Sequence, residues 1–130
     1  MNRYVTDTHS LYWYLIASPN LSAAAKAAFD EGKQGRALIY IPAIVLAELY
    51  YLNKKLGEPI NFAANFGQLQ TGSQFVFVSF EASDVLDFDA HAAVPEMHDR
   101  MIAGVAKRLR LPCITRDLQI ANSGLVSTIW

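Results

Sequence analysis

The sequence predicts a three-layer α/β/α domain built on a mainly parallel sheet of about five strands. Short apolar runs typical of buried strands, such as residues 37–41, alternate along the chain with segments of helical periodicity. The first strand-like run, residues 4–6, leads directly into a helical pattern over residues 11–16, as a central strand of a parallel sheet does. The 130 residues are 52% hydrophobic, so we expect one domain with one substantial core over residues 1–130.

Proline and glycine mark the ends of the expected helices. Ser18-Pro19-Asn20 ends the first helix, because proline cannot continue one. An alanine-rich helix over residues 21–34 ends at Gly35, and Pro42 suits the first turn of a helix that ends at Gly57. The remaining expected elements are a helical hairpin over 43–70, a strand at 75–79, a short helix at 81–90, a helix at 97–110, a strand at 111–115, a brief helix at 117–122 and a strand at 126–129.

Composition and charge exclude several classes of protein. The formal net charge of −1 argues against a domain that holds nucleic acid by bulk electrostatics. Lys54-Lys55 and residues 107–110 place cations at helix ends, where they suit the dipole, with contact to phosphates as the alternative. The only cysteine, Cys113, excludes an internal disulfide and four-cysteine metal sites, and we expect a buried thiol. No membrane span or signal-peptide pattern is present, so we expect a cytoplasmic protein.

Four acidic residues stand at informative positions. Asp7 and Asp117 each follow a predicted strand and precede a helix, where a carboxylate commonly caps the helix. Asp99 lies in the first turn of its helix, where its charge suits the dipole. Glu48 differs, because its apolar neighbours at i−3 and i+4 place it on a stripe that faces the core. A carboxylate buried there needs a cation, a hydrogen-bond network or a metal.

The predicted fold brings these four acids to one place. The carboxyl ends of parallel strands share one edge of the sheet, and the helices of Glu48 and Asp99 start near that edge. Like charges about 4 Å apart repel by roughly 4 kcal/mol at an effective dielectric of about 20, so the cluster needs protons or hard cations. Oxygen ligands favour Mg²⁺ or Mn²⁺ over Zn²⁺, and carboxylate-held Mg²⁺ is common equipment for hydrolysing phosphodiesters.

The acids and their surroundings resemble the PIN-domain ribonucleases, and among them the VapC-type toxins of toxin–antitoxin pairs. The matching segments are Tyr4-Val5-Thr6-Asp7-Thr8 with Leu11 and Leu15, residues 41–49 around Glu48, residues 98–103 beginning His98-Asp99-Arg100, residues 111–117 ending Thr115-Arg116-Asp117, and the tail 123–130. Each segment is short, but they are collinear over essentially the whole chain. The set is therefore more specific than any one of its members.

This resemblance implies a Rossmann-like sheet and a pocket that binds Mg²⁺ or Mn²⁺. It also implies RNA as the substrate, a homodimer, and a cognate antitoxin whose C-terminal segment occupies or blocks the acidic groove. Asp7, Glu48 and Asp99 match the three acids of the family's metal centre, Asp117 matches a more variable fourth acid, and Thr8 and Thr115 match supporting hydroxyl positions.

Other residues near these segments have less specific interpretations. We expect His98 at the rim of the pocket, and His9 and His91 as ordinary helix and loop residues. Arg100 and Arg116 flank site acids and are expected to pair with neighbouring carboxylates, with RNA phosphates as the alternative. The aromatic run at residues 12–14 is expected in the core or a dimer interface rather than stacked on bases.

Four other functions are alternatives to that of a ribonuclease toxin. An aspartate-based phosphatase of the haloacid dehalogenase type needs a second Asp two residues after the first, and here that residue is His9. A response-regulator receiver domain needs an acidic pair near the first strand and a lysine after a late strand, and the chain has neither. An RNA-processing PIN nuclease outside toxin–antitoxin systems stays open, as does a non-catalytic PIN-fold binding module, although the intact acid set argues against the latter.

Overall fold

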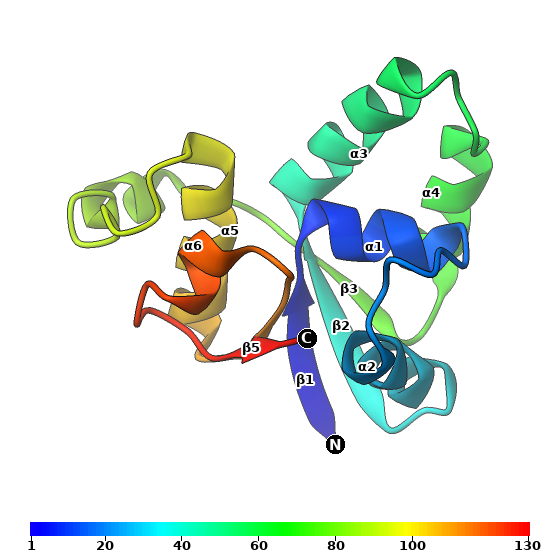
Figure 1. The fold of residues 1–130 in the computed structure, drawn as a ribbon, viewed down its shortest axis with the longest axis horizontal. Helices are drawn as coiled ribbons and strands as arrows, with labels where there is room; N and C mark the ends of the chain where they lie inside the picture. The colour runs from blue at the N-terminus through cyan, green and yellow to red at the C-terminus, as the bar shows by residue number, and fades with distance from the viewer.

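The computed structural model describes residues 1–130 and has a five-stranded sheet in which every neighbouring pair of strands is parallel. The strand order is β3-β2-β1-β4-β5, which places β1 at the centre (Figure 1). This confirms the predicted fold class. The strands are β1 (Asn2–Thr6), β2 (Ala37–Pro42), β3 (Phe75–Val78), β4 (Cys113–Ile114) and β5 (Thr128–Ile129).

Helices connect each strand to the next, as parallel pairing requires. They are α1 (Thr8–Leu15), α2 (Ala23–Lys33), α3 (Ala43–Lys55), α4 (Phe62–Thr71), the 3₁₀ helix η1 (Ala82–Asp87), α5 (Met97–Leu109) and α6 (Leu118–Ala121). None of them combines the length and the apolar character that crossing a membrane needs. The α3–α4 hairpin and the segment from η1 to α5 rise on two sides of the carboxyl ends of the strands (Figure 1).

The last strands are shorter than the sequence predicts. The apolar segment 111–115 gives only the two residues of β4, because Pro112 lacks the N–H that a strand ladder uses. The segment predicted as a short α-helix at 81–90 is instead the 3₁₀ helix η1 followed by turns. It buries a single residue, Asp84, so no apolar stripe supports a longer helix there.

The larger of two hydrophobic clusters holds the sheet and most of its helices together. Val5 and Ile39 from the central strands pack with Leu11, Leu49 and Ile102 from three helices, all almost fully buried. Cys113 belongs to this core, as expected of a buried strand thiol. Because β1 is fixed on both sides by other strands and covered by this core, the residue that follows it is held rigidly in place.

Candidate metal and nucleic-acid site

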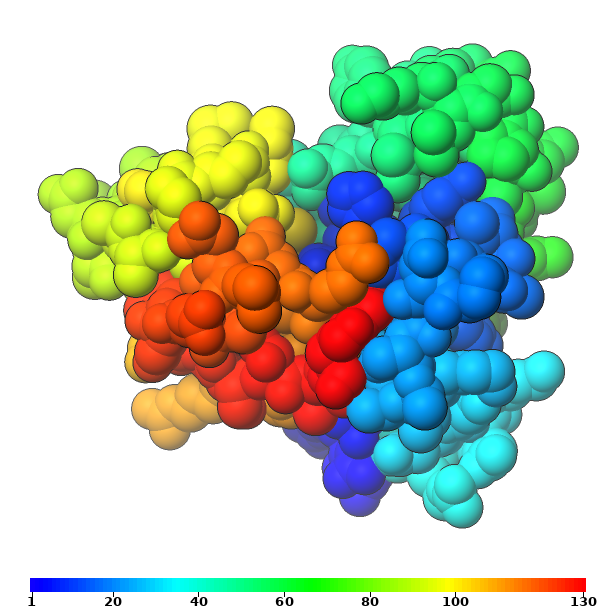
Figure 2. All heavy atoms as spheres, viewed as in Figure 1, coloured from blue at the N-terminus to red at the C-terminus, as the bar shows by residue number.

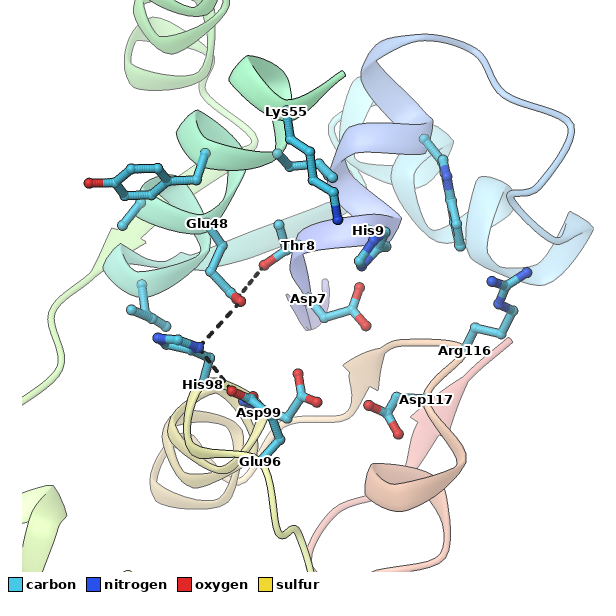
Figure 3. A pocket seen from close by; sticks show the side chains of 15 residues that line it. Asp7, Thr8, His9, Glu48, Lys55, Glu96, His98, Asp99, Arg116 and Asp117 are labelled. Atoms are coloured by element: carbon cyan, nitrogen blue, oxygen red, sulfur yellow. Dashed lines mark hydrogen bonds and ion pairs between the residues drawn. The ribbon is translucent and has the colours of Figure 1, made fainter. Parts of the chain in front are cut away.

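A pocket of about 870 Å³ opens at the carboxyl ends of the strands, between α1, α3 and the start of α5. Figure 2 shows the surface notched between the yellow spheres near residue 100 and the teal and blue spheres of α3 and α1. All four acids singled out in the sequence line this pocket, together with a fifth, Glu96 (Figure 3). The four acids are Asp7, Glu48, Asp99 and Asp117.

Asp7 follows β1 and is the most buried acid of the site, with 8% of its surface exposed. Its Oδ1 accepts a hydrogen bond from the backbone N–H of Ser10 at 2.9 Å, so it caps α1, and its Oδ2 accepts one from the hydroxyl of Thr115. Burial raises the pKa of Asp7, and the hydrogen bonds from Ser10 and Thr115 oppose that rise. The carboxylate is thus held still at the floor of the pocket.

Thr115 links the two strand ends that carry acids. Besides donating to Asp7, its Oγ1 accepts the backbone N–H of Asp117 at 3.0 Å. Asp117 in turn caps α6, accepting the N–H of Gln119 at 2.7 Å. Asp7 and Asp117 therefore both have the capping role that their position in the sequence suggested, and one buried hydroxyl fixes them relative to each other.

Asp99 has a strongly raised pKa. Burial, a hydrogen bond with Asp117, and the negative charges of Asp117, Glu96 and Glu48 together raise the pKa of Asp99 to about 7. Asp99 lies in the first turn of α5, as predicted, but the residue that caps this helix is Glu96, which accepts the N–H of Asp99 at 2.7 Å. Negative charge is therefore concentrated around Asp99, as the predicted acid cluster requires.

Glu48 does not lie in the core, and that expectation was wrong. Val45 and Leu49 form the buried stripe of α3, and the side chain of Glu48, 29% exposed, projects beside it into the pocket. Its Oε1 accepts the hydroxyl of Thr8 at 2.7 Å, and its Oε2 lies 3.8 Å from Nδ1 of His98. Solvent and two polar neighbours therefore replace the buried salt bridge that a core position would need.

The donor set suits a hard divalent cation in its chemistry, although the side chains do not form a finished coordination sphere. The acids that face the pocket offer carboxylate oxygens, which Mg²⁺ and Mn²⁺ prefer. As the side chains stand, no group of three His, Cys, Asp or Glu residues lies close enough together to hold a metal ion. The shared pocket is thus a property of the fold, whereas ligation needs side-chain rotation within it.

Several residues of the pocket were missed or misjudged from the sequence. His9 lines the pocket rather than being an ordinary helix residue, and its ring packs on Trp13 with 5.5 Å between centroids. Lys55 and Glu96 also line it. Glu96 had a local signal, an acid three residues before Asp99 at the start of a helix, which is the pattern of an N-cap.

The two arginines beside the acids do not pair with carboxylates as expected. Arg100 donates to the backbone oxygens of Val94 at 2.7 Å and Phe88 at 3.3 Å, so it fastens the loop before α5. Arg116 lies over the ring of Trp13, 4.6 Å from its centroid, and lines the pocket. His98 stands at the pocket wall, as predicted, within hydrogen-bonding distance of Glu96 at 2.9 Å.

The aromatic run 12–14 packs inward, as predicted for the core. Tyr12 and Trp13 are buried, and Tyr14 stacks on Phe29 with 4.4 Å between the ring centroids. His91 is buried as well, so it differs from the ordinary loop residue that the sequence suggested.

Comparison with known proteins identifies the family. The family model described as the PIN domain matches residues 4–124. A comparison with curated proteins gives no match.

Solved structures share the fold. VapC20 from Mycobacterium tuberculosis, a sarcin-ricin loop cleaving toxin, is 12% identical with a TM-score of 0.72, covering 98% of this chain and 99% of that chain. DNA-bound VapBC from Salmonella typhimurium is 18% identical with a TM-score of 0.71, covering 98% and 97%. VapBC2 from Rickettsia felis, bound to a DNA fragment from its promoter, is 17% identical with a TM-score of 0.69, covering 97% and 96%. The fold, the acid-lined pocket and a family match over nearly the full length agree, and the chain belongs to the PIN-domain family.

Proposed function

We propose that this protein is an endoribonuclease that uses Mg²⁺ or Mn²⁺ to hydrolyse RNA phosphodiesters, acting as the toxin of a toxin–antitoxin pair. The observation that supports this most is the gathering of Asp7, Glu48, Asp99 and Asp117 in one pocket, where the pKa of Asp99 rises to about 7. Burial contributes most to this rise, and the negative potential of Asp117, Glu96 and Glu48 adds to it. A divalent cation relieves that potential in the same way as a proton does.

In this proposal, Asp7, Asp99, Asp117 and Glu48 would hold the cation. When bound, it supplies a water of lowered pKa and charge that offsets the negative charge building up on the phosphate. Asp7 is oriented by the Ser10 N–H and the Thr115 hydroxyl, and Glu48 by the Thr8 hydroxyl, so two of the four acids are aimed before any ligand arrives. Asp99 releases its proton on binding, which makes cation affinity depend on pH.

The toxin role rests on likeness to VapC-type proteins. The similar structures include VapBC assemblies from Salmonella typhimurium and Rickettsia felis. By analogy, the partners would be a cognate antitoxin that blocks the acidic groove and a second copy of this chain in a homodimer, with action in the cytoplasm. A small upstream open reading frame encoding a DNA-binding N-terminus would support the pairing, whereas its absence would favour an RNA-processing nuclease.

The cation requirement is tested by metal removal. We expect the purified chain to cleave labelled RNA with Mg²⁺ or Mn²⁺, to stop when excess EDTA is added, and to recover when Mn²⁺ is restored. Undiminished cleavage in EDTA would contradict the metal mechanism. Absence of cleavage under every condition, by a folded protein that still binds RNA, would instead favour a non-catalytic binding module.

A further inference from the structure

The pocket carries an excess of acidic side chains, which repel a polyanionic substrate. Five carboxylates line it, and only two Lys or Arg side chains do, Lys55 and Arg116. Even a bound divalent cation offsets only part of this excess, and each nucleotide of RNA adds a further negative charge. The substrate must therefore be held by cations at the edges of the acid cluster.

The remaining cations are either engaged elsewhere or lie at the other edge of the sheet. Arg100 is occupied by two loop carbonyls, and Arg108 by Asp84 at 3.1 Å and the backbone oxygen of Ser79 at 2.8 Å. Lys26 and Lys54 form ion pairs within their own helices or just beyond them. The others are Arg3, Lys33, Arg36, Lys107 and Arg110, which lie where β1, β2 and β4 begin.

Arg116 contacts a buried aromatic ring at the pocket. Its Cζ lies 4.6 Å from the ring centroid of Trp13, which is itself buried and packed by His9 at 5.5 Å and by Trp130 at 5.8 Å between ring centroids. It forms no ion pair with any carboxylate. A cation over an aromatic ring is attracted to it, and the fork of N–H donors of a guanidinium matches the oxygens of a phosphate.

Lys55 reaches the same pocket from another wall. It is the last residue of α3, and a helical side chain leans back toward the start of its helix, which carries the Lys55 ammonium over the pocket (Figure 3). Its neighbour Lys54 pairs with Glu58, whereas Lys55 has no ion pair. The two adjacent lysines therefore differ: one stabilises the end of the helix, and the other is free to meet an anion.

Strand order places these two cations on either side of Asp7. Lys55 belongs to the helix after β2, Arg116 follows β4, and Asp7 ends β1, the strand between them. We propose that Lys55 and Arg116 each bind a phosphate of single-stranded RNA, so that its backbone crosses the acid cluster from α3 to the β4–α6 loop. This inference rests on the proposed ribonuclease function, because it assigns the path of that substrate.

The test measures how binding depends on salt. A labelled single-stranded RNA is titrated with the Asp7→Asn protein, and binding is followed by fluorescence anisotropy at several salt concentrations. Log affinity falls as log salt rises, and each phosphate contact adds about 0.7 to the steepness of that fall. Lys55→Ala and Arg116→Ala should therefore each make the slope shallower by about 0.7, and the double variant by about 1.4. Arg116→Lys, which keeps the charge, should restore the slope.

Matched controls remove the same residue types at the opposite edge of the sheet. Lys33→Ala and Arg36→Ala should leave the slope unchanged, since α2 ends and β2 begins away from the pocket. In the cleaving protein, Lys55→Ala and Arg116→Ala should raise KM and leave kcat unchanged, as expected when binding is lost uniformly.

The outcomes separate this inference from the proposed function. Cleavage by the unmodified protein with unchanged slopes in both variants overturns only the phosphate path. If the slope becomes shallower in only one of the two variants, the proposal that both Lys55 and Arg116 bind a phosphate is overturned. Slopes that fall as expected in a protein that never cleaves RNA support the path and overturn the ribonuclease proposal. A protein that binds no RNA overturns both.

Discussion

Asp7 caps α1, and in the proposed function it also holds the cation; these two roles make different demands on its carboxylate. Oδ1 caps α1 through Ser10, and this needs only an acceptor, whereas holding a cation needs charge. We predict that Asp7→Asn lowers cleavage by at least about 100-fold, because a metal ion stabilises the transition state by several kcal/mol. The variant should stay folded, since an amide oxygen still caps the helix. Initial cleavage rates in Mn²⁺ and urea unfolding curves measure the two effects.

The matched control is Asp89→Asn, which removes the same charge from an exposed residue outside the pocket. It should leave both cleavage and stability unchanged. If Asp7→Asn cleaves RNA normally, Asp7 is a helix cap only.

At Glu48, too, a substitution can remove the negative charge and keep the hydrogen bond. Glu48→Gln keeps an acceptor for the Thr8 hydroxyl but removes one of the charges that raise the pKa of Asp99. We predict that the melting temperature in EDTA is unchanged or higher, because the variant relieves repulsion. A clear drop under the same conditions would show that the Glu48 charge stabilises the fold, with His98 as its nearest cation candidate at 3.8 Å.

At the residue scale, local patterns predicted some of the site well and the rest hardly at all. The positions of Asp7 and Asp117 were predictable because each lies between a strand and a helix that follow one another directly in the sequence. The contact between Trp13 and Arg116 joins residues far apart in the chain, and no periodicity encodes it. Glu48 was misplaced for a related reason: its apolar neighbours do line the core, but a residue one position from a buried stripe can face a pocket instead.

At the scale of elements, the hydroxyl of Thr115 joins the ends of β1 and β4. It donates to Asp7 and accepts from the N–H of Asp117. Thr115→Val preserves shape but leaves the buried Oδ2 of Asp7 without its donor, so we predict a loss of about 1–3 kcal/mol in the free energy of unfolding. Cleavage should fall as well, because both acids lose their common anchor. Urea unfolding and cleavage rates in the same buffer measure these losses.

Thr115→Ser serves as the control for that loss, since serine keeps the hydroxyl. It should retain most of the stability and activity. Equal losses in the valine and serine variants would show that packing of the Thr115 methyl group, rather than its hydrogen bonds, is what matters at this position.

The elements themselves were predictable to different degrees. Segments with a clear hydrophobic pattern, such as α5 and the strand β2, match the expectation closely. Their apolar side chains are buried within the sheet or against it, and this burial produces the hydrophobic pattern in the sequence. The two-residue strands β4 and β5 and the 3₁₀ helix η1 depend on their neighbours instead. Segments this short have too little periodicity of their own to specify where they begin and end.

For the whole molecule, topology turns separate local features into one site. Parallel strands place their carboxyl ends together, so the sequence alone predicted that the four acids would share an edge. The shape of the pocket was not predictable, because it depends on how α1, α3 and the start of α5 are placed around the strand ends. Lys55 entered the site in this way, through the length and direction of α3 rather than through any motif.

Folding should also be coupled to protons through Asp99. Its pKa is about 7 in the folded protein, against an ordinary value of 3.8, so the folded state binds the proton more tightly than the unfolded state does. The stability that this proton contributes is fully present below about pH 4 and is lost as the pH rises through about 7. Burial shifts the pKa of Asp7 in the same direction. Burial raises the pKa of Glu96, but hydrogen bonds from the N–H groups of Asp99 and His98 outweigh it, so this pKa is lowered. Glu96 therefore shifts the pH dependence of stability in the opposite direction.

We therefore predict that the melting temperature in EDTA falls as the pH rises from about 5.5 to about 7.5, where Asp99 loses its proton. Asp99→Asn should weaken that dependence and raise the melting temperature at the upper end, because it removes the charge that the neighbouring acids repel. Mn²⁺ added to the unmodified protein at the upper pH should restore the lost stability, since a ligand that binds only the folded state stabilises it. Thermal unfolding followed by circular dichroism measures all three effects, and an unchanged pH dependence in Asp99→Asn would show that another group carries the linkage.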